Sequence, residues 1–392
     1  MKEIRVLHPI TRLIIGGAQE NTMLTADLMN KDVVGDGRYQ VSIVSGPQTG
    51  PEGSLIEEVR ARGIPLTIMP ELLREVSPAN DLKALLKLAQ MMRDGRYHIV
   101  HTHSSKAGVL GRLAAKIARV PVIVHTVHGW SFHEQMSPRK LRFYVALEKI
   151  GDWCGHEAIV VAAKDREKGA AQGIKSAANY PLIRSGIELD RFGHPQIPPA
   201  VMRQQLGIPA NAPVVGSVTR LSAQKAPLDM AAAFAHIAQA RPDAWFVIVG
   251  DGPLRPDVEH ALQATGVAAQ TVLTGLRRDV PELIAVFDVF VLSSLWEGLP
   301  RVLPQAMASG LPIVCTLADG SAEAIVEGEN GFLSPKGQPA HLAAHVIRLL
   351  QDGELRRRMG ENGRLRAPEF GAEKMVADIE ALYRRLLLAR GG

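Results

Sequence analysis

The sequence predicts an α/β protein with two doubly wound parallel sheets in tandem. Short Val- and Ile-rich runs recur along the chain, with amphipathic helical stretches between them, and this alternation is typical of a parallel sheet covered on both faces. The alternation stops at the Pro- and Gly-rich segment 183–200 and then starts again. With 392 residues, 46% of them hydrophobic, the chain is long enough to bury two separate cores.

Six strands are expected in each half. In the first half they are expected at residues 4–10, 39–46, 64–70, 97–104, 120–129 and 157–163. In the second half they are expected at residues 213–221, 244–252, 271–275, 289–294, 311–316 and 331–334. We therefore expect one Rossmann-like domain at 1–195, a second at 196–367, and a C-terminal helix at 368–392.

The C-terminal helix carries an apolar stripe that consists of Met375, Val376, Ile379, Leu382 and Tyr383. This stripe could cap the second domain or return to pack on the first. The sequence leaves both possibilities open.

The composition points to a cytoplasmic protein. The two cysteines, Cys154 and Cys315, cannot form a framework of disulfides, and Cys315 lies in the apolar run "PIVCT", typical of a small buried hydrophobe. No signal peptide is recognisable, and no window approaches the roughly 18 apolar residues of a membrane span. We expect a soluble protein, at most peripheral at the inner face of the cytoplasmic membrane.

The basic charge is concentrated in one segment. Residues 101–150 contain eight Lys or Arg and two acidic residues, an excess of +6 in a chain whose net charge is +5. A nucleic-acid binder usually spreads its positive charge and interleaves aromatic residues, so nucleic acid is not an expected partner. One concentrated patch fits an anionic ligand or an anionic lipid surface better.

The stretch "SSLWEGLPRVLPQAMASG" at 293–310 holds a candidate ligand site. It predicts a strand end, a turn that contains Glu297, and a helix that ends at Gly310. Unpaired N–H groups at a helix start suit a phosphate, whereas the Glu297 carboxylate suits neutral sugar hydroxyls beside it. Gln305 lies two turns further along the helix, and the alternative for both residues is a solvated acid and a solvated amide.

Two more strand ends of the second half carry candidate ligand residues. In "SVTRLSAQKAP", Arg220 and Lys225 can converge on one diphosphate through charge-assisted hydrogen bonds. In "LTGLRRDV", Leu276 and Arg277 suit the two sides of a planar base. The alternative for the cations is that they are ordinary surface residues.

In the first half, Gly16 and Gly17 in "IIGGAQEN" allow a ligand to approach the backbone, but the motif is not the G-x-G-x-x-G fingerprint of NAD enzymes. His128 follows a strand and is expected to face a ligand, although a strand-end histidine is often structural. His101 and His103 are not spaced with Cys or acidic residues as metal ligands are, and the sequence contains no D-x-D pair. We expect neither a metal nor another cofactor.

Taken together, these motifs resemble those of glycosyltransferase family 4. "GGAQ", "HTHSSKAG", "VHTVHG", "IRSGIELDRF", "TRLSAQKAP", "VGDGPLRP", "LTGLRRDV" and "SSLWEGLPRVLPQAMASG" occur in the family's order and spacing over nearly the whole chain. The resemblance implies the GT-B fold, in which two Rossmann-like domains face each other across a cleft. It also implies a retaining, hexosyltransferase-type enzyme that uses a nucleotide diphosphate sugar, with UDP-sugar the expected donor.

The resemblance also implies roles for individual residues. The expected catalytic residues are Glu297, His128, Arg220 and Lys225. The expected donor-binding residues are Gly16, Gly17, Arg220, Lys225, Leu276, Arg277, Glu297, Gly298, Leu299, Val302 and Gln305. Glu297 matches the first acid of the family's E-x7-E motif, and backbone N–H groups near Leu299 and Val302 match its phosphate-binding helix start.

Three positions depart from the family pattern. Gln305 replaces the second acid of E-x7-E, which in relatives binds the ribose hydroxyls, and a neutral acceptor makes a weaker hydrogen bond than a carboxylate. Thr219 and Ala226 stand where glycines are common. These changes leave two alternatives open: a catalytically silent paralogue that acts as a binding partner, and a nucleotide-sugar 2-epimerase.

The acceptor is expected at the first domain. The helix expected in 104–120 turns Val109, Leu110, Leu113 and Ile117 inward. The expected acceptor or membrane patch consists of Arg112, Lys116, Arg119, Arg139, Lys140 and Arg142. A solvated basic face is the alternative, and the sharper hypothesis is a surface for anionic lipid or a lipid-linked, phosphate-bearing acceptor in polysaccharide biosynthesis.

Overall fold

The computed structural model describes residues 3–33, 39–48, 50, 52–133, 136–174 and 177–390. The chain divides into two compact units, the first made of Met1–Gly186 with Ala372–Gly392 and the second of Ile187–Gly371. The expected boundary at 195/196 thus lies nine residues beyond the observed one. The chain returns to the first unit at Ala372, four residues after the expected start of the C-terminal segment.

The first unit contains a six-stranded parallel sheet with the order β3-β2-β1-β4-β5-β6. Its strands are β1 (Ile4–Ile10), β2 (Tyr39–Ser45), β3 (Leu66–Ile68), β4 (Ile99–His103), β5 (Val122–Val127) and β6 (Glu157–Val160). Each strand lies within an expected segment. β1, β4 and β5 are almost continuously buried because helices cover both of their faces.

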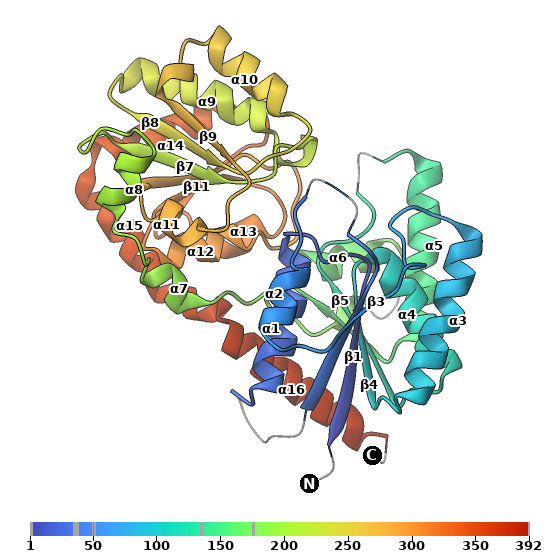
Figure 1. Cartoon of the computed structure of the whole chain (residues 1–392). Coiled ribbons are helices and arrows are strands. Elements are labelled where there is room, and N and C mark those ends of the chain that lie inside the picture. Colours follow the sequence, from blue (N-terminus) through green and yellow to red (C-terminus); the bar gives the residue numbers. More distant parts are fainter. Residues whose placement is uncertain are drawn as a thin grey trace. The chain divides into compact units, whose positions relative to one another are not determined.

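The helices of the first unit are α1 (Gly17–Asn30), α2 (Ile56–Ala61), α3 (Pro78–Asp94), α4 (Ser105–Ile117), α5 (Pro138–Cys154), α6 (Ala163–Ala171), η1 (Ala177–Asn179) and α16 (Ala372–Leu388). Figure 1 shows α3, α4 and α5 on one face of this sheet and α1, α2 and α16 on the other. The separate apolar clusters on the two faces are consistent with this arrangement.

The helix α16 belongs to the core of the first unit. The five apolar residues of the expected stripe are all buried, in one cluster with β1, β2 and α1. Of the two positions that the sequence left open, the structure has the helix on the first unit.

The second unit contains a parallel sheet with the order β12-β11-β10-β7-β8-β9. Its strands are β7 (Val214–Val218), β8 (Trp245–Val249), β9 (Thr271–Gly275), β10 (Val289–Leu292), β11 (Ile313–Thr316) and β12 (Gly331–Ser334). Renumbered from its own first strand, this sheet repeats the 3-2-1-4-5-6 order of the first. The prediction of two doubly wound parallel sheets is confirmed.

Helices also flank the second sheet. They are α7 (Leu189–Gly193), α8 (Pro199–Gln205), η2 (Ala223–Lys225), α9 (Pro227–Ala240), α10 (Arg255–Ala264), η3 (Ala268–Gln270), α11 (Val280–Ile284), α12 (Val302–Ala308), α13 (Ser321–Ala324), α14 (Pro339–Gln351), α15 (Gly353–Arg366) and η4 (Ala367–Phe370). The helices α9, α10 and α14 cover one face of the sheet, and α7, α11 and α12 cover the other (Figure 1).

The strand order determines where a ligand is expected. In each sheet the order reverses between the first and fourth strands, β1 and β4 in the first unit and β7 and β10 in the second. Ligands of open α/β sheets bind beyond the carboxyl ends of the strands at this switch point.

Of the helices in the part of the chain that the structure describes, none combines the length and the apolar character that a membrane crossing needs.

Candidate functional site

The loops that follow β7 and β10 are held together at the switch point of the second unit. The Leu295 N–H donates to the Gln224 carbonyl at 2.8 Å, and Gln224 Nε2 donates to the Trp296 carbonyl at 2.9 Å. The Ser293 hydroxyl donates to the carbonyls of Lys225 and Ala226, at 2.8 and 3.0 Å. These bonds position the side chains of both loops at the carboxyl end of the sheet.

This arrangement brings Lys225 and Glu297 together. Lys225 Nζ forms an ion pair with Glu297 Oε1, which also accepts a 2.6 Å hydrogen bond from the Ser294 hydroxyl. Only 7% of the Glu297 side chain is exposed, and 19% of the Lys225 side chain. The pair therefore presents a cation and a carboxylate from one partly shielded position.

Arg220 and Ala226 lie in the same loop as Lys225. Arg220 is exposed directly after β7, whereas Ala226 has a left-handed backbone (φ 42°, ψ 55°) at the start of α9. An alanine in this conformation is strained, whereas a glycine would adopt it at little cost. Thr219 is buried, and its N–H donates to the Val249 carbonyl at 2.9 Å.

Behind Glu297 the chain turns into α12, as expected from the sequence. Leu299 is buried and Val302 begins the helix, while Gly310 ends the segment with φ 72°. Gln305 is buried within α12, so it is not the solvated amide of the alternative interpretation. Gly298, the remaining residue expected in this stretch, is half-buried.

Leu276 and Arg277 follow β9, two strands from β7 and three from β10 in the sheet. Leu276 is exposed, and its expected role beside a planar base stays a prediction. Arg277 instead forms two hydrogen bonds with Asp279, one of them 2.7 Å from Nε to Oδ1. These hydrogen bonds lower the pKa of the Asp279 carboxyl and raise that of the Arg277 guanidinium.

In the first unit, Gly16 and Gly17 lie where the chain passes from β1 to α1. Gly16 precedes the helix with an extended backbone, and its carbonyl accepts from the Glu20 N–H at 3.0 Å. A Cβ added at Gly16 would meet Gln19 Oε1 at 2.8 Å. Gly17 is exposed as the first residue of α1.

His128 follows β5 in the same unit and is half-buried. Its Nε2 lies 3.1 Å from His103 Nδ1, and His103 Nε2 lies 2.8 Å from His8 Nδ1. Sequence reasoning did not include His8 or Tyr383 among the functional candidates. The hydroxyl of Tyr383 lies 2.5 Å from His101 Nδ1 and 3.4 Å from His8 Nε2.

Three histidines of this cluster are candidate metal ligands by their spacing. One ring nitrogen from each of His8, His101 and His103 lies within 4.8 Å of the others. However, both nitrogens of every one of these rings already have a hydrogen-bond partner, including Thr126 Oγ1 at 2.7 Å from His101 Nε2. The absence of a metal remains a prediction.

The expected basic patch needs a correction at Arg112, which is buried on α4. Its guanidinium forms a 3.1 Å ion pair with the buried Glu148 of α5, and its Nε donates to the Gly108 carbonyl at 2.8 Å. The guanidinium occupies space that Gly151 leaves open, because a Cβ there would lie 2.2 Å from Arg112 Nη2. Since α3 and α5 pack on either side of α4, Arg112 does not face outward as expected. Ile117, expected inward, is exposed.

The other patch residues are exposed on α4, α5 or the turn after α4. These are Lys116, Arg119, Arg139, Lys140 and Arg142. Lys116 Nζ lies 3.5 Å from the centre of the Trp153 ring and donates to the Trp153 carbonyl at 2.9 Å. Trp153 is 69% exposed and Phe143 51% exposed, so α5 shows large apolar side chains beside its cations.

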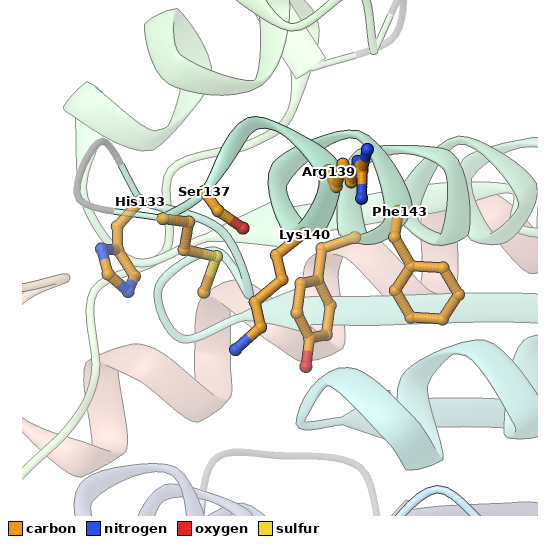
Figure 2. Close-up of a pocket in the computed structure, with 7 residues that line it drawn as sticks. His133, Ser137, Arg139, Lys140 and Phe143 are labelled. Carbon is orange, nitrogen blue, oxygen red and sulfur yellow. The ribbon is translucent and has the colours of Figure 1, made fainter.

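An open hollow lies at the start of α5. Its volume is about 670 Å³, and its lining consists of His133, Met136, Ser137, Arg139, Lys140, Phe143 and Tyr144. Figure 2 shows Lys140 and Phe143 extending from the helix at this hollow. The hollow thus combines an ammonium group with aromatic surface.

Neither cysteine has the properties of a nucleophile. Cys154 and Cys315 are free and buried, and burial raises the pKa of both thiols.

Comparison with known proteins identifies the family. Residues 200–366 match the family model "Glycosyl transferases group 1", and residues 34–179 match "Glycosyl transferase 4-like domain". An Escherichia coli protein, UDP-Gal:alpha-D-GlcNAc-diphosphoundecaprenol alpha-1,3-galactosyltransferase, is 31% identical over 389 residues, 97% of each chain. The chain belongs to glycosyltransferase family 4. It is a glycosyltransferase, and its two sheets form the GT-B fold.

Other relatives agree with this family. N-acetyl-alpha-D-glucosaminyl L-malate synthase of Bacillus anthracis is 32% identical over 319 residues, 78% of this chain and 79% of its own. Among solved structures, Anabaena Alr3699/HepE in complex with UDP and glucose superposes with a TM-score of 0.83 at 23% identity. That match covers 98% of this chain and 100% of the Anabaena chain.

Proposed function

We propose that this glycosyltransferase moves a sugar from a UDP-sugar to a lipid-linked precursor of a polysaccharide, with retention at the anomeric carbon and without a metal. The observation that carries the proposal is the Lys225–Glu297 pair at the switch point of the second unit. The Escherichia coli relative, whose name specifies UDP-Gal and an undecaprenyl diphosphate carrier, supports the choice of donor and acceptor.

In the proposed donor site, the cations bind the diphosphate and the carboxylate binds the sugar. Negative charge grows on the diphosphate as the glycosidic bond breaks, and the cations Arg220 and Lys225 stabilise it without a divalent ion. Glu297 accepts hydrogen bonds from hydroxyls of the donor sugar. On donor binding Lys225 exchanges its carboxylate partner for a phosphate oxygen, so the Lys225–Glu297 pair holds both side chains ready before the donor arrives.

The acceptor meets the first unit at α5. Lys140 and Arg139 supply charge for a phosphate group, and Phe143 with Met136 supplies apolar surface for the beginning of a lipid chain. The same helix also exposes Ile150, Trp153 and Arg142, which supply apolar and basic contacts for anionic headgroups. We therefore propose peripheral contact with the cytoplasmic membrane through α5.

A transfer assay tests the reaction. The enzyme is incubated with UDP-Gal, UDP-Glc or UDP-GlcNAc and an undecaprenyl diphosphate-linked GlcNAc acceptor, with and without EDTA. Transfer from one donor, unaffected by EDTA and with an α-anomeric product by NMR, is the expected result. Inhibition by EDTA that added Mg²⁺ or Mn²⁺ reverses would refute metal independence, and conversion of donor without acceptor would indicate an epimerase.

Vesicle sedimentation tests the membrane contact. Binding to vesicles rich in phosphatidylglycerol is expected to fall when Arg139, Lys140 and Arg142 are each replaced by Glu, and to fall again with Trp153→Ala. The triple exchange of Lys336, Arg357 and Arg358 to Glu, at exposed positions of the second unit, is the charge-matched control. Equal binding of the α5 variant and this control would exclude α5 as the contact.

A further inference from the structure

A continuous chain of hydrogen bonds runs from His128 into the core of the first unit. Its links are His128 Nε2 to His103 Nδ1 (3.1 Å), His103 Nε2 to His8 Nδ1 (2.8 Å), His8 Nε2 to the Tyr383 hydroxyl (3.4 Å), Tyr383 to His101 Nδ1 (2.5 Å), and His101 Nε2 to the Thr126 hydroxyl (2.7 Å). We call these six residues the histidine relay. It uses β1, β4, β5 with the loop that follows it, and the C-terminal helix α16.

The inner imidazoles of the relay are neutral. His8, His101 and His103 are buried, and burial lowers the pKa of His8 to about 3 and the pKa values of the other two well below the usual value. A neutral imidazole carries one N–H, so it donates from one ring nitrogen and accepts at the other.

With one proton on each inner ring and the Tyr383 hydroxyl donating to one of its two histidine neighbours, the relay has two ordered states. In the first, every hydrogen points from His128 toward Thr126, so His128 donates from Nε2 and its Nδ1 is an acceptor. In the second, the Thr126 hydroxyl donates to His101, every later link is reversed, and the proton of His128 lies on Nδ1. In both states the Tyr383 hydroxyl connects His8 to His101.

We propose that His8, His101, His103 and Tyr383 are positioning residues that together set the tautomer of His128. They thereby decide which of the two ring nitrogens of His128 carries the proton. The effect on sugar transfer rests on the proposed function and on the catalytic role that the family resemblance implies for His128, whereas the tautomer itself rests on neither. The relay also connects the C-terminal helix to His128, which lies 255 residues from Tyr383 in the chain.

A purely apolar packing role would not explain this arrangement. Both nitrogens of each inner ring find a partner in the relay, although the rings come from two strands and the hydroxyl at their centre from α16. A buried network with all members satisfied selects one arrangement of its side chains, which is what a tautomer-setting device requires.

The test uses the full chain labelled with ¹⁵N-histidine. Imidazole ¹⁵N shifts report the tautomer of each ring, and the signal of His128 is assigned by its loss in His128→Gln. We expect one tautomer of His128 in the wild type. Tyr383→Phe, which removes the central hydroxyl, should convert this signal to a mixture, and Thr126→Val should do the same from the far end of the relay.

Tyr39→Phe is the matched control. Its ring lies 6.0 Å from that of Tyr383 in the same core, and its hydroxyl is not a member of the relay. The same variants are assayed for transfer, where Tyr383→Phe is expected to lower kcat about tenfold, as loss of an orienting partner does, with KM for the donor within about twofold. Tyr39→Phe should leave both parameters near wild type.

Two results would overturn the inference. One is an unchanged His128 tautomer in both Tyr383→Phe and Thr126→Val. The other is a stoichiometric transition metal in the purified wild type, because it would occupy nitrogens that the relay uses. The NMR measurement needs no substrate, so an inactive wild type would count against the proposed function alone.

Discussion

Lys225 and Glu297, 72 residues apart in the sequence, form an ion pair where the loops after β7 and β10 meet. Parallel pairing of β7 with β10 makes this contact possible, because it brings the carboxyl ends of both strands to the same edge of the sheet. A ligand with a diphosphate and neutral hydroxyls would find partners for both at this place. The pair is the structural basis of the proposed donor site.

The exchange Gln305→Glu should tighten UDP binding. If the buried Gln305 receives the ribose hydroxyls, as the resemblance implies, a carboxylate makes these hydrogen bonds stronger by about 1 kcal/mol, or roughly fivefold in Kd. Isothermal titration calorimetry with UDP measures this change, and Gln305→Ala should weaken binding. Unchanged affinity in both variants would show that the ribose binds elsewhere.

Arg112→Ala should destabilise the first unit strongly. It leaves the buried Glu148 carboxylate without its cation, a change that typically costs about 3–5 kcal/mol. Urea unfolding followed by circular dichroism measures the loss. The control is Arg142→Ala at an exposed position of α5, with an expected change within about 0.5 kcal/mol. Equal effects of the two variants would contradict a structural role for Arg112.

Acid should weaken the fold through its buried histidines. His8 titrates near 6.5 when unfolded and at about 3 when folded, so between these values the unfolded chain binds more protons. Its contribution to stability is therefore fully present above pH 6.5 and is lost as the pH falls toward 3, by up to about 1.4 kcal/mol per pH unit.

Unfolding measured at pH 7.5, 6.5 and 5.5 shows this dependence. His8→Gln should make the free energy of unfolding depend less steeply on pH. His236→Gln, at an exposed position, should leave this pH dependence unchanged. Equal stability at pH 5.5 and 7.5 would contradict a buried, neutral His8.

Ala226→Gly should stabilise the second unit, although glycine usually weakens a helix. The left-handed backbone at position 226 destabilises the folded state by about 1–2 kcal/mol when the residue is alanine, and glycine relieves this strain. Glycine also makes the unfolded chain more flexible, which costs about 0.4–1 kcal/mol of stability. The net expectation is a gain of up to about 1.6 kcal/mol in the free energy of unfolding. Ala232→Gly inside α9 should instead lose about 1 kcal/mol, and similar losses at both positions would refute the strain.

The strands could be predicted well from the sequence because each is a short apolar run bounded by turn residues. The runs at 4–10, 271–275 and 331–334 coincide with β1, β9 and β12. Glu297 and Lys225 could be found as well, since each lies just beyond such a run. Their ion pair could not be predicted, because it depends on the strand order, and the sequence pattern does not specify that order.

The same limit explains what was missed in the first unit. His8 lies in the interior of an apolar run and Tyr383 on an apolar helical stripe, so the pattern marks neither as a functional candidate. Their contact depends on β1 pairing with β4 and on α16 returning to that sheet. Arg112 was misplaced because helical spacing shows which face a residue is on, but not that α5 covers that face.

The most direct test of the central claim is kcat/KM for transfer from the preferred UDP-sugar, in wild type and in Lys225→Ala. We expect a loss of about 10²–10³-fold, because one preorganised donor to the leaving diphosphate is removed. Gln263→Ala, at an exposed position of α10, serves as the folded control with wild-type activity. A Lys225→Ala enzyme within tenfold of wild type would contradict the assignment of this residue to the donor diphosphate.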